Sequence, residues 1–155
     1  MITVERETYD QIINDILPLL EQHWKEVANY QDEIKLEPNL EKYQKAEQAG
    51  GLVILAAREN GTLIGYSVFF TFKHPHYDSC LVASNDILFV VAAKRNTGAG
   101  LKLIRKSESI LTKLGVRRIT WHCKPKNDFR ALLERMGYEV EETILGKLLG
   151  DDHGI

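Results

Sequence analysis

Two glycines close together are the residues whose type and spacing suggest chemistry most directly. Gly98 and Gly100 follow an apolar run, within the segment 90–100, at a point where a helix should begin. The first turn of a helix has unpaired N–H donors and a partial positive charge, and glycine lets a ligand approach these donors closely. The N–H groups of Gly98, Ala99 and Gly100 are therefore predicted to bind phosphate. A glycine-rich turn without a ligand is the common alternative for so short a pattern.

A single acid lies in the strand that leads to this loop. Asp86 is the only acidic residue between Leu81 and Val91, where apolar residues dominate. A carboxylate there costs desolvation free energy unless it faces a cleft or is paired. Asp86 is therefore a candidate general base, with Ser84 and Asn85 as supporting neighbours, and a structural hydrogen bond is the alternative.

Three further side chains are candidates for contact with a substrate. His23 lies at the edge of an apolar helix face, where a packed surface histidine is the usual finding. His76 and Tyr77 lie in the loop before the strand that carries Asp86. No metal is expected, because His74 and His76 have no second matched pair of ligands.

The elements that must position these residues follow from the apolar periodicity. One strand–helix–strand crossover in the second half makes the fold class α+β. A short helix capped by Asn127 or Asp128 is expected to end at Met136. The other predicted helices are 9–29, 37–49 and 98–114, and the predicted strands are 2–6, 52–58, 63–72, 81–91, 116–123 and 138–149.

Local signals refine this outline. Thr8 is the predicted N-cap of the first helix. Pro18 is expected to kink or divide that helix, and the continuous phase of the apolar face favours two packed segments over an open loop. Pro38 suits the first turn of the second helix. The pair Asn60-Gly61 predicts a two-residue hairpin turn, because both residues tolerate positive φ. A glycine at position 65 suggests a bulge in the returning strand, and residues 73–78 are predicted to form a loop.

A family resemblance enters through these residues. Arg95 precedes the glycine pair in the order Arg-x-x-Gly-x-Gly, directly after the apolar strand. This pattern resembles the acyl-CoA pyrophosphate loop of the GNAT family of N-acetyltransferases. Asn127, the short helix after it and the pair Gly137-Tyr138 also resemble that family, which assigns Asn127 to the cofactor site. The resemblance covers residues 52–149 and implies a GNAT-like (acyl-CoA N-acyltransferase) fold with a central mixed, mostly antiparallel sheet flanked by helices.

The resemblance also implies a reaction, in which an acetyl group passes from acetyl-CoA to a primary amine of a small molecule or a protein. The glycine loop would bind the pyrophosphate, helped by Lys94 and Arg95. The main chain near Leu88 and Val90 would pair with the pantetheine arm, and an N–H near Val90 would polarise the thioester carbonyl. Asp86 would take the proton of the amine, directly or through water.

One position departs from the family pattern. Many members have a tyrosine in the last short helix that protonates the departing thiolate, and the equivalent place here is Leu133. Water or another residue could replace it, or CoA could leave as a thiolate, because thiols have a pKa of about 8.5. The departure favours an alternative function, an acyl-CoA-binding module that acts through a partner with little or no turnover. A nucleotide-binding α/β protein is disfavoured because no Gly-Lys-Ser/Thr ending follows the glycines.

The composition of the 155 residues is that of one globular domain, predicted at 1–149 with a disordered tail at 150–155. A net charge of -2 gives no electrostatic reason to expect nucleic acid or an anionic membrane as partner. Cys80 and Cys123 form no CxxC pair and are expected to be free thiols of a cytoplasmic protein. No signal peptide or membrane-spanning run is evident. Exposed edge strands make a homodimer a further expectation.

Overall fold

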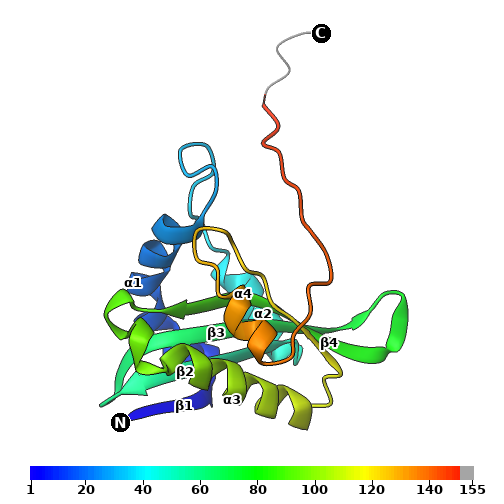
Figure 1. The fold of residues 1–155 in the computed structure, drawn as a ribbon, viewed down its shortest axis with the longest axis horizontal. Helices are drawn as coiled ribbons and strands as arrows, with labels where there is room; N and C mark the ends of the chain where they lie inside the picture. The colour runs from blue at the N-terminus through cyan, green and yellow to red at the C-terminus, as the bar shows by residue number, and fades with distance from the viewer. Residues whose placement is uncertain (151–155) are drawn as a thin grey trace.

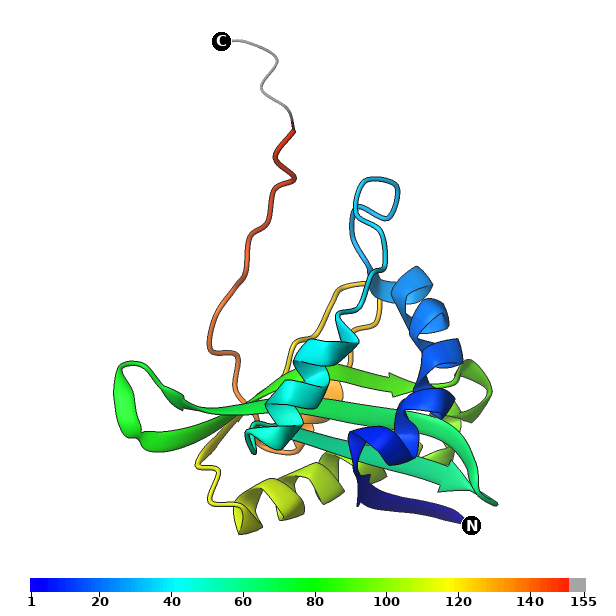
Figure 2. The same ribbon diagram turned by 180° about the vertical axis from the view of Figure 1, so that it is seen from behind.

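A five-stranded sheet lies between two layers of helices in the computed structural model, which describes residues 1–150 (Figures 1 and 2). The strands are β1 (Ile2–Glu7), β2 (Leu52–Glu59), β3 (Thr62–His74), β4 (Tyr77–Val90) and β5 (Arg118–Thr120). The helices are α1 (Tyr9–Val27), α2 (Leu40–Gln48), the 3₁₀ helix η1 (Ala92–Thr97), α3 (Ala99–Lys113) and α4 (Arg130–Arg135).

The strands lie in the order β1-β2-β3-β4-β5, which is also their order in the chain. The first four are antiparallel to their neighbours, and β5 is parallel to β4. Figures 1 and 2 show α1 and α2 on one face of the sheet and α3 and α4 on the other. The crossover from β4 through α3 to β5 confirms the predicted α+β class.

Each face of the sheet has its own hydrophobic core, because side chains alternate along a strand. Under α1 and α2, the core includes Ile12, Tyr66 and Phe89. Under α3, it includes Phe69 and Leu103. All five side chains are 1% exposed or less, and burying one of this size stabilises the fold by about 1.5–3 kcal/mol. These two layers fix where α1 and α3 lie relative to β4.

Two of the local signals are confirmed in detail. Thr8 caps α1: its side chain accepts from the Gln11 N–H at 3.4 Å, and the Gln11 side chain accepts from the Thr8 N–H at 2.8 Å. Asn60 and Gly61 have φ values of 51° and 83°, as a type I′ turn requires. Both signals depend only on residues close in sequence, so the pattern alone predicts them.

Two helices differ from the prediction. Of the kink or division expected at Pro18, the division does not occur, because α1 is a single helix from Tyr9 to Val27. Packing of its apolar face against the sheet on both sides of the proline compensates for the lost N–H donor. The second helix begins at Leu40 rather than at 37, because the Asn39 side chain caps it by accepting from the Lys42 N–H at 3.1 Å.

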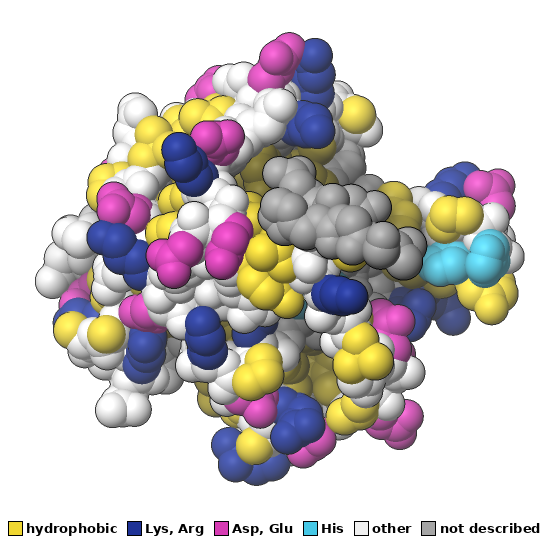
Figure 3. Space-filling view, turned by 90° about the horizontal axis from the view of Figure 1, so that it is seen from above, with side chains coloured by type: hydrophobic (Ala, Val, Ile, Leu, Met, Phe, Trp, Pro, Cys, Tyr) yellow, Lys and Arg dark blue, Asp and Glu magenta, His cyan; other side chains and the backbone are white. Residues whose placement is uncertain are grey.

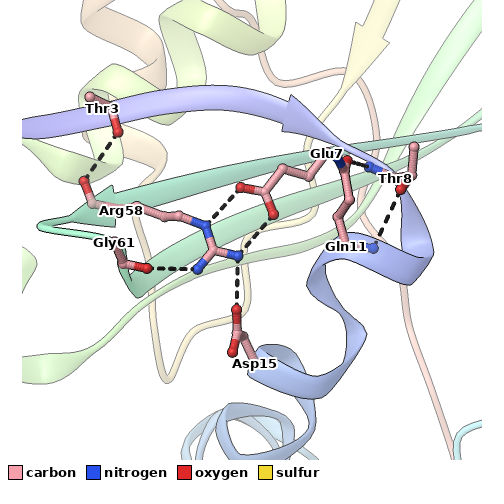
Figure 4. Close-up of polar contacts among 7 residues, drawn as sticks. All are labelled: Thr3, Glu7, Thr8, Gln11, Asp15, Arg58 and Gly61. Carbon is pink, nitrogen blue, oxygen red and sulfur yellow. Dashed lines mark hydrogen bonds and ion pairs between the residues drawn. The ribbon is translucent and has the colours of Figure 1, made fainter.

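Arg58 ties the first part of the chain together (Figure 4). Its Nε donates to Glu7 Oε1 at 2.7 Å, and its Nη2 donates to Asp15 Oδ2 at 2.8 Å. Its Nη1 donates to the Gly61 carbonyl at 2.9 Å. The hydrogen bond to Glu7 raises the pKa of Arg58 most, and the bond to Asp15 adds to it. One side chain thus joins β1, β2, the hairpin turn and α1.

A bulge and a long hairpin shape β3 and β4. The register between β2 and β3 shifts beside Gly65, as predicted, and a Cβ there would lie 2.7 Å from the Phe89 carbonyl oxygen. The predicted loop at 73–78 was wrong, because β3 continues to His74 and β4 begins at Tyr77. Only residues 75–76 form a turn, since the ladder continues as a hairpin arm that projects from the body in Figure 1.

The end of the chain also differs from the prediction. The strand expected at 138–149 does not form, and the strand expected at 116–123 is reduced to the three residues of β5. Figure 1 shows the chain leaving α4 and running away from the body. Ile144 and Leu145 are 70% and 90% exposed. So short a β5 offers few ladder bonds to a sixth strand. The predicted tail at 150–155 lies, apart from Gly150, outside the described residues.

Candidate active site

A bulge in β4 determines where Asp86 points. Asn85 pairs with Phe69 and Ile87 pairs with Val68 on β3, so Asp86 is the extra residue between two paired ones. Such a bulge bends the strand and turns a side chain out of the regular alternation. The Asp86 carboxylate is accordingly exposed, whereas Asn85 is buried.

Asn85 holds this bulge in place. Its buried side-chain Nδ2 donates to the Ile87 carbonyl at 2.8 Å and to the Val68 carbonyl at 3.3 Å. One residue earlier in the strand, the Ser84 hydroxyl lies 3.1 Å from Nε2 of His122. The bulge is therefore supported by side chains before it and by main-chain acceptors on both strands.

Beyond Ser84, the outer edge of β4 has no described strand beside it. β5 pairs with β4 only over Val82–Ser84. Val91 donates its N–H to the Ile64 carbonyl at 2.9 Å, toward β3. Because main-chain groups alternate in direction along a strand, those of Leu88 and Val90 point to the open outer edge.

Asp86 lies in a cleft between β4, α1 and the segment that follows β5, with a cavity of about 70 Å³. The cleft brings together four residues predicted for the site from the sequence. They are His23, Asp86, Leu88 and Asn127. The other lining residues are Val27, Asn85, His122, Lys124 and Phe129.

Tyr43 is the direct partner of Asp86. Its hydroxyl, on α2, donates to Asp86 Oδ2 at 2.7 Å. Burial raises the pKa of Tyr43 well above its usual range, and the bond to Asp86 raises it further. The hydroxyl therefore remains a neutral donor at neutral pH. No local sequence pattern identifies this residue, because only the packing of α2 brings it to β4.

His23 lines the cleft from α1. Burial lowers its pKa from the ordinary value, and the positive charges of Lys124 and Arg95 lower it further, against the opposing effect of Glu26. Its ring packs on Phe89 with centroids 5.1 Å apart. At neutral pH the imidazole is therefore uncharged and able to accept a proton.

The glycine loop is exposed at Gly98 and partly exposed at Gly100, whereas Ala99 between them is buried. Gly98 is the N-cap of α3 with φ 82°, and no side chain caps the helix. A Cβ built on Gly98 would meet nothing within 4 Å, and one on Gly100 would meet only Val90 Cγ2 at 3.9 Å. The loop corner is thus open, in the way a phosphate site at a helix start requires.

The two basic residues beside this loop are engaged elsewhere. Arg95 donates from Nε to the Val90 carbonyl at 3.0 Å and from Nη2 to Glu26 on α1. Lys94 forms an ion pair with Glu59. A bound anion at the loop would therefore depend mainly on main-chain N–H groups unless these pairs open.

His76 and Tyr77 do not line the cleft. They lie at the tip of the β3–β4 hairpin, where His74 packs on both rings with centroids 5.3 Å and 5.1 Å apart. Figure 3 shows histidine side chains on this projecting arm. The extension of the hairpin ladder carries both residues away from Asp86.

No tyrosine stands at the position of the family's usual acid. Leu133 is 5% exposed and belongs to the interior. The nearby Tyr138 hydroxyl donates to Glu108 Oε1 at 2.8 Å, and burial, with that bond, raises the pKa of Tyr138 to about 12. Tyr138 is therefore engaged on α3 rather than in the cleft.

Within residues 1–150, no helix combines the length and apolarity needed to cross a membrane. The same residues contain no group of three or more His, Cys, Asp or Glu side chains placed to bind a metal ion.

Solved structures show the same fold at low sequence identity. An aminoglycoside acetyltransferase from an uncultured soil metagenomic sample is 16% identical, with a TM-score of 0.72 and 97% of each chain covered. Glucosamine-6-phosphate N-acetyltransferase from Arabidopsis thaliana is 13% identical, with a TM-score of 0.72, covering 97% of this chain and 99% of that one. A predicted acetyltransferase with acetyl-CoA from Clostridium acetobutylicum is 13% identical, with a TM-score of 0.73, covering 99% and 100%.

These neighbours confirm the predicted acyl-CoA N-acyltransferase fold. No curated protein matches the chain. The model of the acetyltransferase (GNAT) family matches residues 13–138, which is well over half of the sequence. The chain therefore belongs to the GNAT family of acetyltransferases, as the loop pattern predicted.

Proposed function

We propose that this protein transfers an acetyl group from acetyl-CoA to a primary amine by direct attack on the thioester. The observation that carries the proposal is the open glycine loop at the end of the bulged strand that bears Asp86. Family membership supports the reaction class. The acceptors in the names of two neighbours, an aminoglycoside and glucosamine-6-phosphate, are both amines.

The residues present fit acetyl-CoA. The N–H groups of Gly98, Ala99 and Gly100 bind the pyrophosphate at an uncapped helix start, where no side chain fills the corner. The outward main-chain groups of Leu88 and the N–H of Val90 pair with the pantetheine arm as an added strand would, while the Val90 carbonyl is held by Arg95. The Val90 N–H then lies where negative charge develops on the thioester oxygen.

The acceptor enters the cleft as an ammonium ion and must lose a proton before it attacks. Asp86 takes this proton, directly or through one water, and Tyr43 holds the carboxylate oriented. The free amine forms a C–N bond with the thioester carbon, the C–S bond breaks, and the nitrogen loses its second proton to solvent, which gives the neutral amide. With Leu133 in place of a tyrosine, CoA leaves as a thiolate and takes its proton from solvent, because a thiol pKa of about 8.5 makes it a tolerable leaving group.

A substitution in the glycine loop tests the CoA site. Gly100→Asp places a carboxylate among the donors, and a Cβ there meets only Val90 Cγ2 at 3.9 Å, so the fold should tolerate it. The variant should lose CoA binding in calorimetry, because the new charge repels the diphosphate. Gly146→Asp adds the same charge at a glycine with nothing within 4 Å on the chain beyond α4 and should bind CoA normally. Equal affinity in the two variants would remove the loop from the proposal.

A second function rests on Leu133. The protein would bind an acyl-CoA and act through a partner with little or no turnover. Calorimetric CoA binding without thiol release, over a panel that includes aliphatic, aromatic, aminosugar and peptide amines, would favour it over the enzyme. A cytoplasmic location and a homodimer remain predictions.

A further inference from the structure

A second cavity lies beside the cleft, on the face of the sheet that α1 and α2 cover. Its volume is about 50 Å³, and isoleucine and leucine side chains form most of its wall. None of its described lining residues carries a formal charge at neutral pH. The cavity therefore suits a compact apolar group and offers no partner to a cation.

One polar group in this wall has no partner. Tyr66 lines the cavity and is 0% exposed, and its hydroxyl has no hydrogen-bond partner among the described residues. An unsatisfied buried hydroxyl typically costs about 1–3 kcal/mol, so a retained one points to a bound group that satisfies it. Burial raises the pKa of Tyr66, with smaller contributions from Asp86 and Tyr43, so the hydroxyl stays protonated.

Tyr43 connects the two cavities. Its side chain lines the apolar cavity, while its hydroxyl donates to Asp86, which lines the cleft. Ile87, the residue after Asp86 on β4, also lines the apolar cavity. An amine held at Asp86 would therefore have its substituent directed past Tyr43, along Ile87 and toward Tyr66.

We infer that the acceptor is a primary amine with one compact, largely apolar substituent that ends in an uncharged hydrogen-bonding group, such as a hydroxyphenyl ring, and that this substituent occupies the cavity between α1, α2 and the sheet. This inference rests on the proposed function. The amine lies at Asp86, and the hydrogen-bonding group of the substituent pairs with the Tyr66 hydroxyl. Polyamines and aminoglycosides fit poorly, because their further charges would be desolvated against an uncharged wall.

Acetylation of simple amines tests the substrate class. Phenethylamine and isopentylamine serve as apolar probes, and ethanolamine and spermidine as polar ones, with thiol release from acetyl-CoA as the readout. The apolar probes should have a kcat/KM about tenfold or more above that of ethanolamine, since each buried methylene favours binding by a factor of about 10 or more. Equal or greater kcat/KM for spermidine would overturn the inference and leave the proposed function intact.

A matched pair of tryptophan variants tests the cavity itself. Leu20→Trp fills it from α1, whereas Leu17→Trp adds the same ring to the same helix at a side chain that is 41% exposed and outside the cavity. Leu20→Trp should raise KM for phenethylamine about tenfold or more with CoA affinity unchanged, and Leu17→Trp should leave both unchanged. The same KM in both variants would place the substituent elsewhere.

Tyr66→Phe separates a ligand role from a structural one and preserves the shape of the side chain. Removing an unsatisfied hydroxyl should leave the thermal midpoint unchanged or raise it. If the acceptor bonds to this hydroxyl, affinity for tyramine, which carries a phenolic hydroxyl, should nevertheless fall about fivefold or more, whereas affinity for phenethylamine should not change. Unchanged affinity for tyramine in the variant would contradict the proposed bond.

Calorimetry can measure the binding of phenethylamine to the protein alone. This measurement tests the cavity even if the protein acetylates no amine. Binding that Leu20→Trp weakens, together with no acetylation of any amine, would support the cavity and contradict the proposed transferase. Acetylation without binding of phenethylamine to the free protein or its CoA complex would support the transferase and overturn the cavity. Absence of both binding and acetylation would contradict both.

Discussion

One inserted residue in β4 decides the chemistry available in the cleft. Without the bulge, the position of Asp86 would follow the alternation of the strand and its carboxylate would enter one of the two cores. Asn85 closes the bulge with bonds to two carbonyl groups, and Tyr43 binds the carboxylate that the bulge turns outward. The acid is therefore held by position and hydrogen bonding rather than by burial.

Asp86→Asn tests the proton acceptor. The amide is the same size and can still accept from Tyr43, but it cannot take a proton, so kcat should fall by about 10²–10⁴. CoA affinity measured by calorimetry should not change, because the glycine loop is untouched. Asp78→Asn, on the exposed hairpin arm, is the control and should keep full activity. An unchanged rate in Asp86→Asn would show that another group takes the proton.

His23 makes stability depend on pH. Its pKa is lower in the folded protein, chiefly through burial, than the unfolded value near 6.5. The unfolded chain therefore binds more protons below that pH, and the free energy of unfolding should fall as the pH falls from about 8 to 5. In His23→Gln this decrease should be smaller, as measured by urea unfolding at both ends of the range. His76→Gln, at the hairpin tip, should follow the wild type.

At the scale of elements, the hydrogen bonds from Arg58 on β2 to β1 and α1 should contribute clearly to stability. Arg58→Met keeps the aliphatic length but leaves Glu7, whose side chain is only 17% exposed, without its partner. The free energy of unfolding should fall by about 1–3 kcal/mol in urea titrations. Lys45→Met breaks an ion pair whose two side chains are 69% and 71% exposed, and should cost less than about 0.5 kcal/mol. Similar losses in the two variants would contradict this role.

At this scale, predictions that depend on residues close in sequence were confirmed, and predictions that depend on packing between distant segments were not. The hairpin turn and the cap of α1 depend on residues within four positions of one another, so the sequence predicts both. Pro18 gave a misleading signal, because the apolar face of α1 packs on the sheet across the proline. The hairpin arm was not predicted, because the residues around Pro75 and His76 are typical of a loop. In the structure, cross-strand pairing continues up to these two residues.

For the molecule as a whole, the segment after Tyr138 should add little stability. A chain that ends at Glu139 loses exposed side chains and the surface ion pair of Arg118 with Glu141. Its thermal midpoint should lie within about 4 °C of the full chain, since such a pair contributes at most about 1 kcal/mol. A chain that ends at Gly137 also loses Tyr138 and its bond to Glu108, and should melt clearly lower. A large decrease in the first truncation would mean that the segment packs on the body in solution.

Sequence patterns alone predict the α+β class and most strand and helix positions. They also single out the glycine loop and Asp86, the one acid of the central strand. These follow from local periodicity, caps and glycines, whose physics acts over a few residues. Only the tertiary structure decided that Tyr43, forty-three positions from Asp86 in the chain, is its partner, and that Tyr66 lies unpaired beside an apolar cavity. Such contacts depend on how α1 and α2 pack on the sheet, and no local pattern encodes that packing.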